Sequence, residues 1–182
     1  MPVAALALVA IWALAEALLF FIVADVPIMA VGIRFGWRKG VAAACIAAVC
    51  AGLGGLIVTQ WAAADPAGAQ AAIEQVPAIS RTLMEQAAID YSAGGWRAML
   101  AGSFAGTPYK LYALAAGITG DNPAGFFLAS IVARLPRFLL VGIGGGFLGP
   151  RLREKWSARR VWLLFTCAWA LFYAVYFAAM PG

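Results

Sequence analysis

Long apolar segments without charge alternate with short polar segments along this chain. The longest uncharged segment is 40–64, and it exceeds the roughly 20 residues that an α-helix needs to cross a bilayer. Residues 122–150 and 161–180 have the same apolar character, although 122–150 contains Arg134 and Arg137. The pattern therefore predicts three transmembrane helices.

Two further apolar segments are interrupted by residues that disfavour a continuous helix. Residues 1–36 are interrupted before Pro27, because proline lacks a backbone donor and restricts the residue before it. Residues 98–120 are interrupted in the same way at Gly106 and Pro108. Each segment is predicted to form two short helices around a break.

The whole chain, 1–182, is predicted to be a single membrane domain. Its most polar stretch reads as an extramembrane connector, with an amphipathic helix over 79–91. The predicted divisions are a first hairpin plus transmembrane helix (1–61), the polar connector (62–97), a second hairpin plus transmembrane helix (98–150), a basic cytoplasmic loop (151–160) and a C-terminal transmembrane helix (161–180).

The distribution of basic residues predicts the orientation of these segments. Loops rich in lysine and arginine tend to face the cytoplasm, which places the acidic connector outside. The two broken segments must then each enter and leave on one side, from opposite faces. This predicts an all-α membrane protein with two re-entrant hairpins in an inverted repeat and about three transmembrane helices. The basic residues are Arg34, Arg38, Lys39, Arg151, Arg153, Lys155, Arg159 and Arg160.

Composition supports a membrane protein and excludes several other classes. Of the 182 residues, 64% are hydrophobic and only 12% are charged, about half the share in a soluble domain. The net charge of +5 fits basic cytoplasmic loops, and no basic stripe with aromatic residues suggests nucleic acid. The chain has no histidine, its serines have no evident base, and its acidic residues lack metal-ligand spacing. We therefore expect no enzyme, no cofactor and no metal.

Five charged residues lie inside the apolar segments and are the candidate functional residues. Each would cost roughly 2.5–3.5 kcal/mol facing lipid at the bilayer centre, so they must pair or line a wet cavity. Glu16 and Asp25 are nine residues apart, and the break before Pro27 can bring both carboxylates into one cavity. The alternative is structural, with the carboxylates neutralising the arginines and holding the bundle together. The five are Glu16, Asp25, Lys110, Arg134 and Arg137.

The segment 127–141 carries a further pattern. Ser130, Arg134 and Arg137 have i, i+4, i+7 spacing and are predicted to form one polar stripe, while Pro136 is predicted to break or kink the helix. Further along, the glycines of 144–149 match G-x-G-x-x-G. No strand is predicted before them, so this motif does not indicate a dinucleotide site.

Three stretches of sequence resemble motifs of the DedA (VTT-domain, SNARE-associated-like) membrane proteins, and most closely the short YqaA-like branch. The stretches are AEALLFFIVADVP, GSFAGTPYKLYALAAG at 102–117 and FLASIVARLPRFLLV at 127–141. The resemblance covers roughly 10–150, with departures at Gly106 and Pro136. It implies facing re-entrant hairpins, residence in the bacterial inner membrane, and lipid or ion translocation. Glu16 and Asp25 match the family's acidic positions, and Lys110, Arg134 and Arg137 match its basic positions.

The resemblance also implies a substrate class. Members of the family are linked to recycling of undecaprenyl phosphate, to proton-dependent membrane homeostasis and to phospholipid scrambling. We therefore expect a transporter, a flippase or scramblase, that translocates an anionic lipid headgroup of undecaprenyl phosphate or a phospholipid. The phosphate would fit Arg134 and Arg137, whose guanidinium groups suit phosphate oxygens, and Glu16 is the candidate for proton coupling.

Two alternatives stay open at this point. One is a proton-coupled carrier of a small solute or ion, and the other is a non-transporting structural or assembly protein. The expected partners are membrane lipids with an anionic phosphate headgroup, and protons. A homo-oligomer is compatible with the sequence, which leaves the oligomeric state, the substrate and the direction of transport open.

Overall fold

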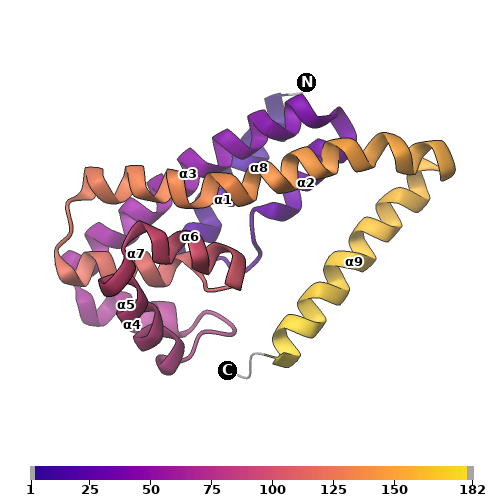
Figure 1. Ribbon diagram of the computed structural model, residues 1–182. Helices are drawn as coiled ribbons and strands as arrows, with labels where there is room; N and C mark the ends of the chain where they lie inside the picture. Colours follow the sequence, from indigo (N-terminus) through magenta and orange to yellow (C-terminus); the bar gives the residue numbers. More distant parts are fainter. Residues whose placement is uncertain (1–2, 180–182) are drawn as a thin grey trace.

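The computed structural model describes residues 3–179, and in this part of the chain all regular secondary structure is helical, without a β-strand. Figure 1 shows the helices packed around two long, crossing helices, with the last helix set apart from the others. The nine helices are α1 (Val3–Leu18), α2 (Asp25–Phe35), α3 (Trp37–Ala64), α4 (Pro66–Glu74), α5 (Arg81–Gly94), α6 (Trp96–Ala105), α7 (Tyr109–Thr119), α8 (Pro123–Lys155) and α9 (Ala158–Ala179).

Three of these helices, α3, α8 and α9, are long and apolar enough to cross a membrane. They correspond to the three uncharged or nearly uncharged segments of the sequence. The structure therefore supports a membrane protein of the all-α class. Residue 180, at the end of the predicted C-terminal helix, and residues 1–2, at the start of the first predicted hairpin, lie outside the described part.

The centre of the molecule is the crossing of α3 and α8, which approach backbone to backbone. A Cβ atom on Gly40 would lie 2.1 Å from the Gly142 carbonyl oxygen, so only glycine fits there. Gly146 and Gly149 similarly meet the backbone at Trp37 and Ile33. Small residues at helix interfaces allow such contact in membrane proteins. The glycines near the G-x-G-x-x-G match are thus explained largely by helix packing.

The order short helix, break, short helix, long helix occurs twice, as α1–α2–α3 and as α6–α7–α8. The repeated order agrees with the sequence pattern, while an inverted arrangement of the two halves in a bilayer remains a prediction. The second break occupies 106–108, where Gly106 has the left-handed φ of 90° and Pro108 is the N-cap of α7.

The first break differs from the prediction, since it occupies 19–24 and Pro27 is not itself the break. Pro27 lies in the first turn of α2, where a missing N–H is tolerated because that group has no acceptor within the helix. Side chains from elsewhere take up the freed backbone groups of 19–24. Trp12 Nε1 donates to the Ile22 carbonyl at 3.0 Å, and the Val23 N–H donates to the Tyr173 hydroxyl at 2.7 Å.

The prediction of a helix break at Pro136 is wrong, because α8, which is 33 residues long, continues through Pro136. A proline removes one hydrogen bond, and membrane helices tolerate this where neighbouring groups compensate. The basic segment 151–160 is also not a loop. Arginine, lysine and glutamate favour helix, and α8 extends to Lys155 before α9 begins at Ala158.

The polar connector contains two helices, α4 and α5, where the sequence predicted one. Both begin at a capping side chain, since Asp65 accepts from the Gly68 N–H at 2.9 Å and Ser80 accepts from the Leu83 N–H at 3.3 Å. Helix α5 is amphipathic, with Tyr91 on its buried face. The Tyr91 hydroxyl donates to Asp121 at 2.6 Å, which fastens the connector to the turn before α8.

Candidate functional site

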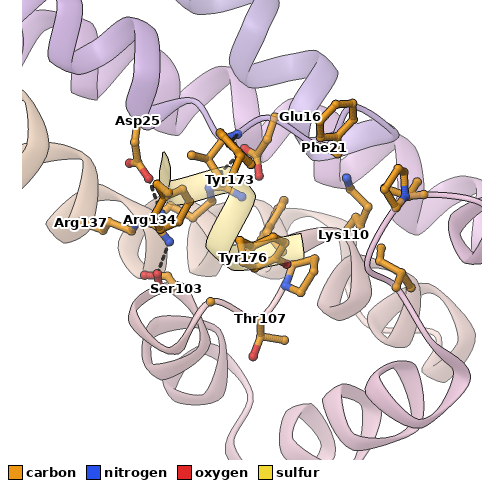
Figure 2. Close-up of a pocket in the computed structure, with 18 of the residues that line it drawn as sticks. Glu16, Phe21, Asp25, Ser103, Thr107, Lys110, Arg134, Arg137, Tyr173 and Tyr176 are labelled. Atoms are coloured by element: carbon orange, nitrogen blue, oxygen red, sulfur yellow. Dashed lines mark hydrogen bonds and ion pairs between the residues drawn. The ribbon is translucent and has the colours of Figure 1, made fainter. Parts of the chain in front are cut away.

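A cavity of about 90 Å³ lies where the two helix breaks meet α8, and the last third of α9 forms one of its walls. This volume has room for several water molecules or for one small polyatomic group. Figure 2 shows charged and aromatic side chains gathered around it. All five charged residues singled out in the sequence line this cavity: Glu16 from α1, Asp25 from α2, Lys110 from α7, and Arg134 and Arg137 from α8.

Four of the five charges form two ion pairs between different helices. Arg134 Nη2 donates to Glu16 Oε2, and Arg137 Nη2 donates to Asp25 Oδ2. The Asp25 side chain is only 2% exposed. Removing one partner of a buried pair leaves an uncompensated charge, typically at a cost of about 3–5 kcal/mol. The pairs therefore fix α8 against both helices that flank the first break.

The Arg134 guanidinium is also held by two aromatic rings. Its Cζ lies 4.4 Å from the centre of the Tyr109 ring and 4.9 Å from that of Phe138. The Tyr109 hydroxyl in turn donates to Ser130 Oγ at 2.7 Å, so Ser130 orients this ring. The three residues of the predicted polar stripe on α8 therefore have different positions. Arg134 and Arg137 line the cavity, while Ser130 lies behind Tyr109.

Lys110 is the fifth charge, and its bonding differs from that of the arginines. Its Nζ donates to the Phe20 carbonyl at 2.9 Å, and within residues 3–179 no carboxylate lies within salt-bridge distance of it. Lys110 is 3% exposed. The residue after the second break therefore binds the backbone of the first break, and the cavity keeps one positive charge beyond its two ion pairs.

Three buried polar atoms at the cavity have no hydrogen-bond partner within the described residues: Asp25 Oδ1, Ser103 Oγ and Arg134 Nε. Most buried polar atoms in folded proteins are paired, and an unpaired one costs free energy. Ser103 also contributes its carbonyl, which accepts from Arg137 Nη1. These atoms provide two donors and one acceptor for water or a bound group.

Two helix N-termini border the same cavity. Helix α7 begins at Tyr109 after Pro108, without a side-chain cap, and helix α2 begins at Asp25 after Ala24, also uncapped by a side chain. The first N–H groups of a helix have no partner within it and carry partial positive charge, which favours anions. In α2 the Asp25 carboxylate lies in the first turn and compensates the partial positive charge of that N-terminus. The first turn of α7 holds no acidic residue, so its N-terminal charge is not compensated in this way.

Sequence reasoning missed the contribution of the last helix. Tyr173 and Tyr176 from α9 line the cavity, and the Tyr173 hydroxyl accepts from the Val23 N–H of the first break. The sequence feature that could have indicated this role is the presence of tyrosines in an apolar segment without charge. A buried tyrosine hydroxyl usually has a polar partner.

Within residues 3–179, no group of three or more histidine, cysteine, aspartate or glutamate side chains is placed to hold a metal ion. The cavity instead presents arginine, lysine, hydroxyl and backbone donors, which are ligands for anions. The chain matches no protein-family model, no curated protein and no solved structure. The resemblance to the DedA family therefore remains a prediction from the motifs.

Proposed function

We propose that this protein is a membrane transporter that translocates the anionic headgroup of a lipid, undecaprenyl phosphate or a phospholipid, across a bacterial inner membrane. The observation that carries the proposal is the convergence of five intramembrane charges on one cavity between two helix breaks. Discontinuous helices that meet near the membrane centre are a common construction of transporter binding sites.

The charges and donors of the cavity favour an anion. Three cations face two carboxylates, so a singly charged phosphate group would neutralise the remainder. Among residues 3–179, Arg134 Nε and the Ser103 hydroxyl are donors without a partner, and Lys110 has only a neutral carbonyl as its partner. Arginine forks match phosphate oxygens, and the α7 N-terminus adds a favourable field.

A purely structural role for the charges explains less of the geometry. The pairs of Arg134 with Glu16 and of Arg137 with Asp25 would by themselves neutralise four charges and connect the helices. Lys110 is buried and has no carboxylate partner in the described part of the chain, so it adds a desolvation cost and no ion-pair stabilisation. A site that receives an anion accounts for this cost, because the ligand supplies the missing charge.

The arrangement of the basic residues supports the orientation in the membrane. Arg153 Nη2, near the end of α8, donates to the Ile33 carbonyl at 2.6 Å, and Trp37 stacks on Phe147 with ring centres 6.4 Å apart. These contacts bring the basic α2–α3 corner and the basic α8–α9 corner to one end of the bundle. By the positive-inside rule this end faces the cytoplasm.

The test is transbilayer movement of labelled lipid in proteoliposomes. We expect Arg134→Ala and Glu16→Gln to lower the rates for fluorescent phospholipid or undecaprenyl phosphate at least tenfold. The matched control is the exposed pair on the connector, Glu74 and Arg81, where Glu74→Gln and Arg81→Ala should leave the rates unchanged. Wild-type rates in both cavity variants would refute the proposal.

The two other hypotheses predict different results in the same vesicles. A proton-coupled solute or ion carrier, suggested by the buried Glu16 carboxylate, would give solute flux driven by a pH gradient without lipid movement. A structural protein would retain its function when Glu16 and Arg134 exchange places as Glu16→Arg with Arg134→Glu. Failure of that exchange, with correct folding, would count against the structural role.

A further inference from the structure

A second, larger hollow lies next to the charged cavity, between helices α2, α8 and α9. Its volume is about 730 Å³, within the range of small-molecule binding sites. Asp25, Arg137 and Phe172 line both spaces, so the groove and the cavity share a wall. We call this hollow the α8–α9 groove; its other lining residues include Met29, Leu140, Gly144, Leu148, Ala168 and Trp169.

The α8–α9 groove is apolar except at the wall that it shares with the cavity. Asp25 and Arg137 are the only ionisable side chains that line it among the described residues. Along α8 the lining extends from Arg137 to Leu152, which at 1.5 Å per residue is about 22 Å. The groove is therefore long and apolar, and its charged end adjoins the anion-binding cavity.

Helix α9 leaves the groove open along its length. Figure 1 shows α9 turning back from the end of α8, so that the two helices diverge. Of its residues, only Val161 is buried, and Leu164 and Phe172 in the groove are half-exposed. An elongated apolar molecule could therefore enter sideways from the bilayer rather than through the aqueous phase.

We propose that the α8–α9 groove binds the hydrocarbon chain of the lipid whose anionic headgroup occupies the cavity. This inference rests on the proposed function and adds the place in the fold where the hydrocarbon chain of that lipid is held. Its basis is continuity: one wall, formed by Asp25 and Arg137, separates a cavity that selects negative charge from a groove that selects apolar chains.

One glycine allows the groove to be filled without disturbing helix packing. A Cβ atom on Gly144 would meet nothing within 4 Å, whereas on its neighbours Gly145 and Gly146 it would collide with backbone atoms of α2 and α3. Gly144→Trp should therefore fill the groove and leave the fold intact. Gly144→Ala is the matched control, since it makes the same backbone change without filling the space.

The experiment compares three phosphate probes on purified protein in nanodiscs: inorganic phosphate, butyl phosphate and a dodecyl phosphate with a photoreactive chain end. We expect the dodecyl probe to crosslink to groove residues of α8 and α9, and Gly144→Trp to weaken its binding at least tenfold. Binding of butyl phosphate should change less than twofold in that variant, and Gly144→Ala should leave both unchanged. A dodecyl trimethylammonium probe of the same length should label the groove far less.

The outcomes separate this inference from the proposed function. If none of the phosphates binds, or if Arg134→Ala leaves their binding unchanged, the anion site itself is refuted. If the phosphates bind but dodecyl and butyl phosphate respond alike to Gly144→Trp, the groove does not hold the chain. Should Gly144→Trp not fold, Ala168→Trp fills the groove from the α9 side. Loss of a dimer in either variant, with unchanged dodecyl phosphate binding, would assign the groove to a second copy.

Discussion

The ion pair between Glu16 and Arg134 should be the most strongly coupled side-chain pair of the cavity. The two side chains are 9% and 7% exposed, so replacing Arg134 with methionine leaves a buried carboxylate without its cation. Breaking such a pair costs about 3–5 kcal/mol, and the contacts of the guanidinium with two aromatic rings add to this loss. We therefore expect Arg134→Met to lower the free energy of unfolding by about 3–5 kcal/mol.

Adding Glu16→Gln to Arg134→Met should restore much of that loss, because the side chain at position 16 then carries no charge that needs the missing cation. The assay is a double-mutant cycle, with reversible unfolding in mixed micelles followed by tryptophan fluorescence. The coupling energy should be about 2 kcal/mol or more. The same cycle on Glu74 and Arg81, whose side chains are 29% and 75% exposed, should give less than about 1 kcal/mol. Equal coupling in the two pairs would refute the reasoning.

Three further predictions follow from other contacts. Lys110→Met loses the hydrogen bond to the Phe20 carbonyl but, within residues 3–179, no ion pair, so it should lower the free energy of unfolding by less than Arg134→Met does, while phosphate binding measured by calorimetry falls at least tenfold. Gly40→Ala places a methyl group 2.1 Å from the Gly142 carbonyl oxygen and should lower the unfolding midpoint markedly. Gly144→Ala, whose methyl group would meet no atom within 4 Å, should leave the midpoint unchanged. Burial, together with the hydrogen bond to Asp121, raises the pKa of Tyr91, so the protein binds this proton more tightly folded than unfolded. That contribution is complete below pH 10 and is lost as the pH rises further, and Tyr91→Phe should remove this part of the pH dependence of unfolding while costing about 1–2 kcal/mol at neutral pH.

The long helices could be predicted from the sequence because their signal is local. An uncharged run such as 40–64 is stable in a bilayer only as a helix, whatever it packs against. The glycine and proline at 106–108 also act locally, through their backbone preferences. The convergence of the charges followed from their cost in lipid, which requires each one to find a partner or water.

The details that the sequence did not predict depend on partners distant in the chain. The first break lies at 19–24, in residues that have no breaker among them, because Trp12, Lys110 and Tyr173 bond to its backbone. The same reason explains why the tyrosines of α9 were missed. Pro136 does not interrupt α8, because the free energy of one lost backbone hydrogen bond is smaller than that of the packing on both sides of it.

The backbone contact between Gly40 and Gly142 has a consequence for the relative motion of helices α3 and α8. Interfaces built of interdigitating side chains can slide by changing rotamers, but two peptide backbones in direct contact offer no such adjustment. Helices α3 and α8 can therefore rotate about this point more readily than they can separate. The crossing is therefore a fixed point of the bundle, and the helix that packing holds least is α9, of whose residues Ala158–Ala179 only Val161 is buried.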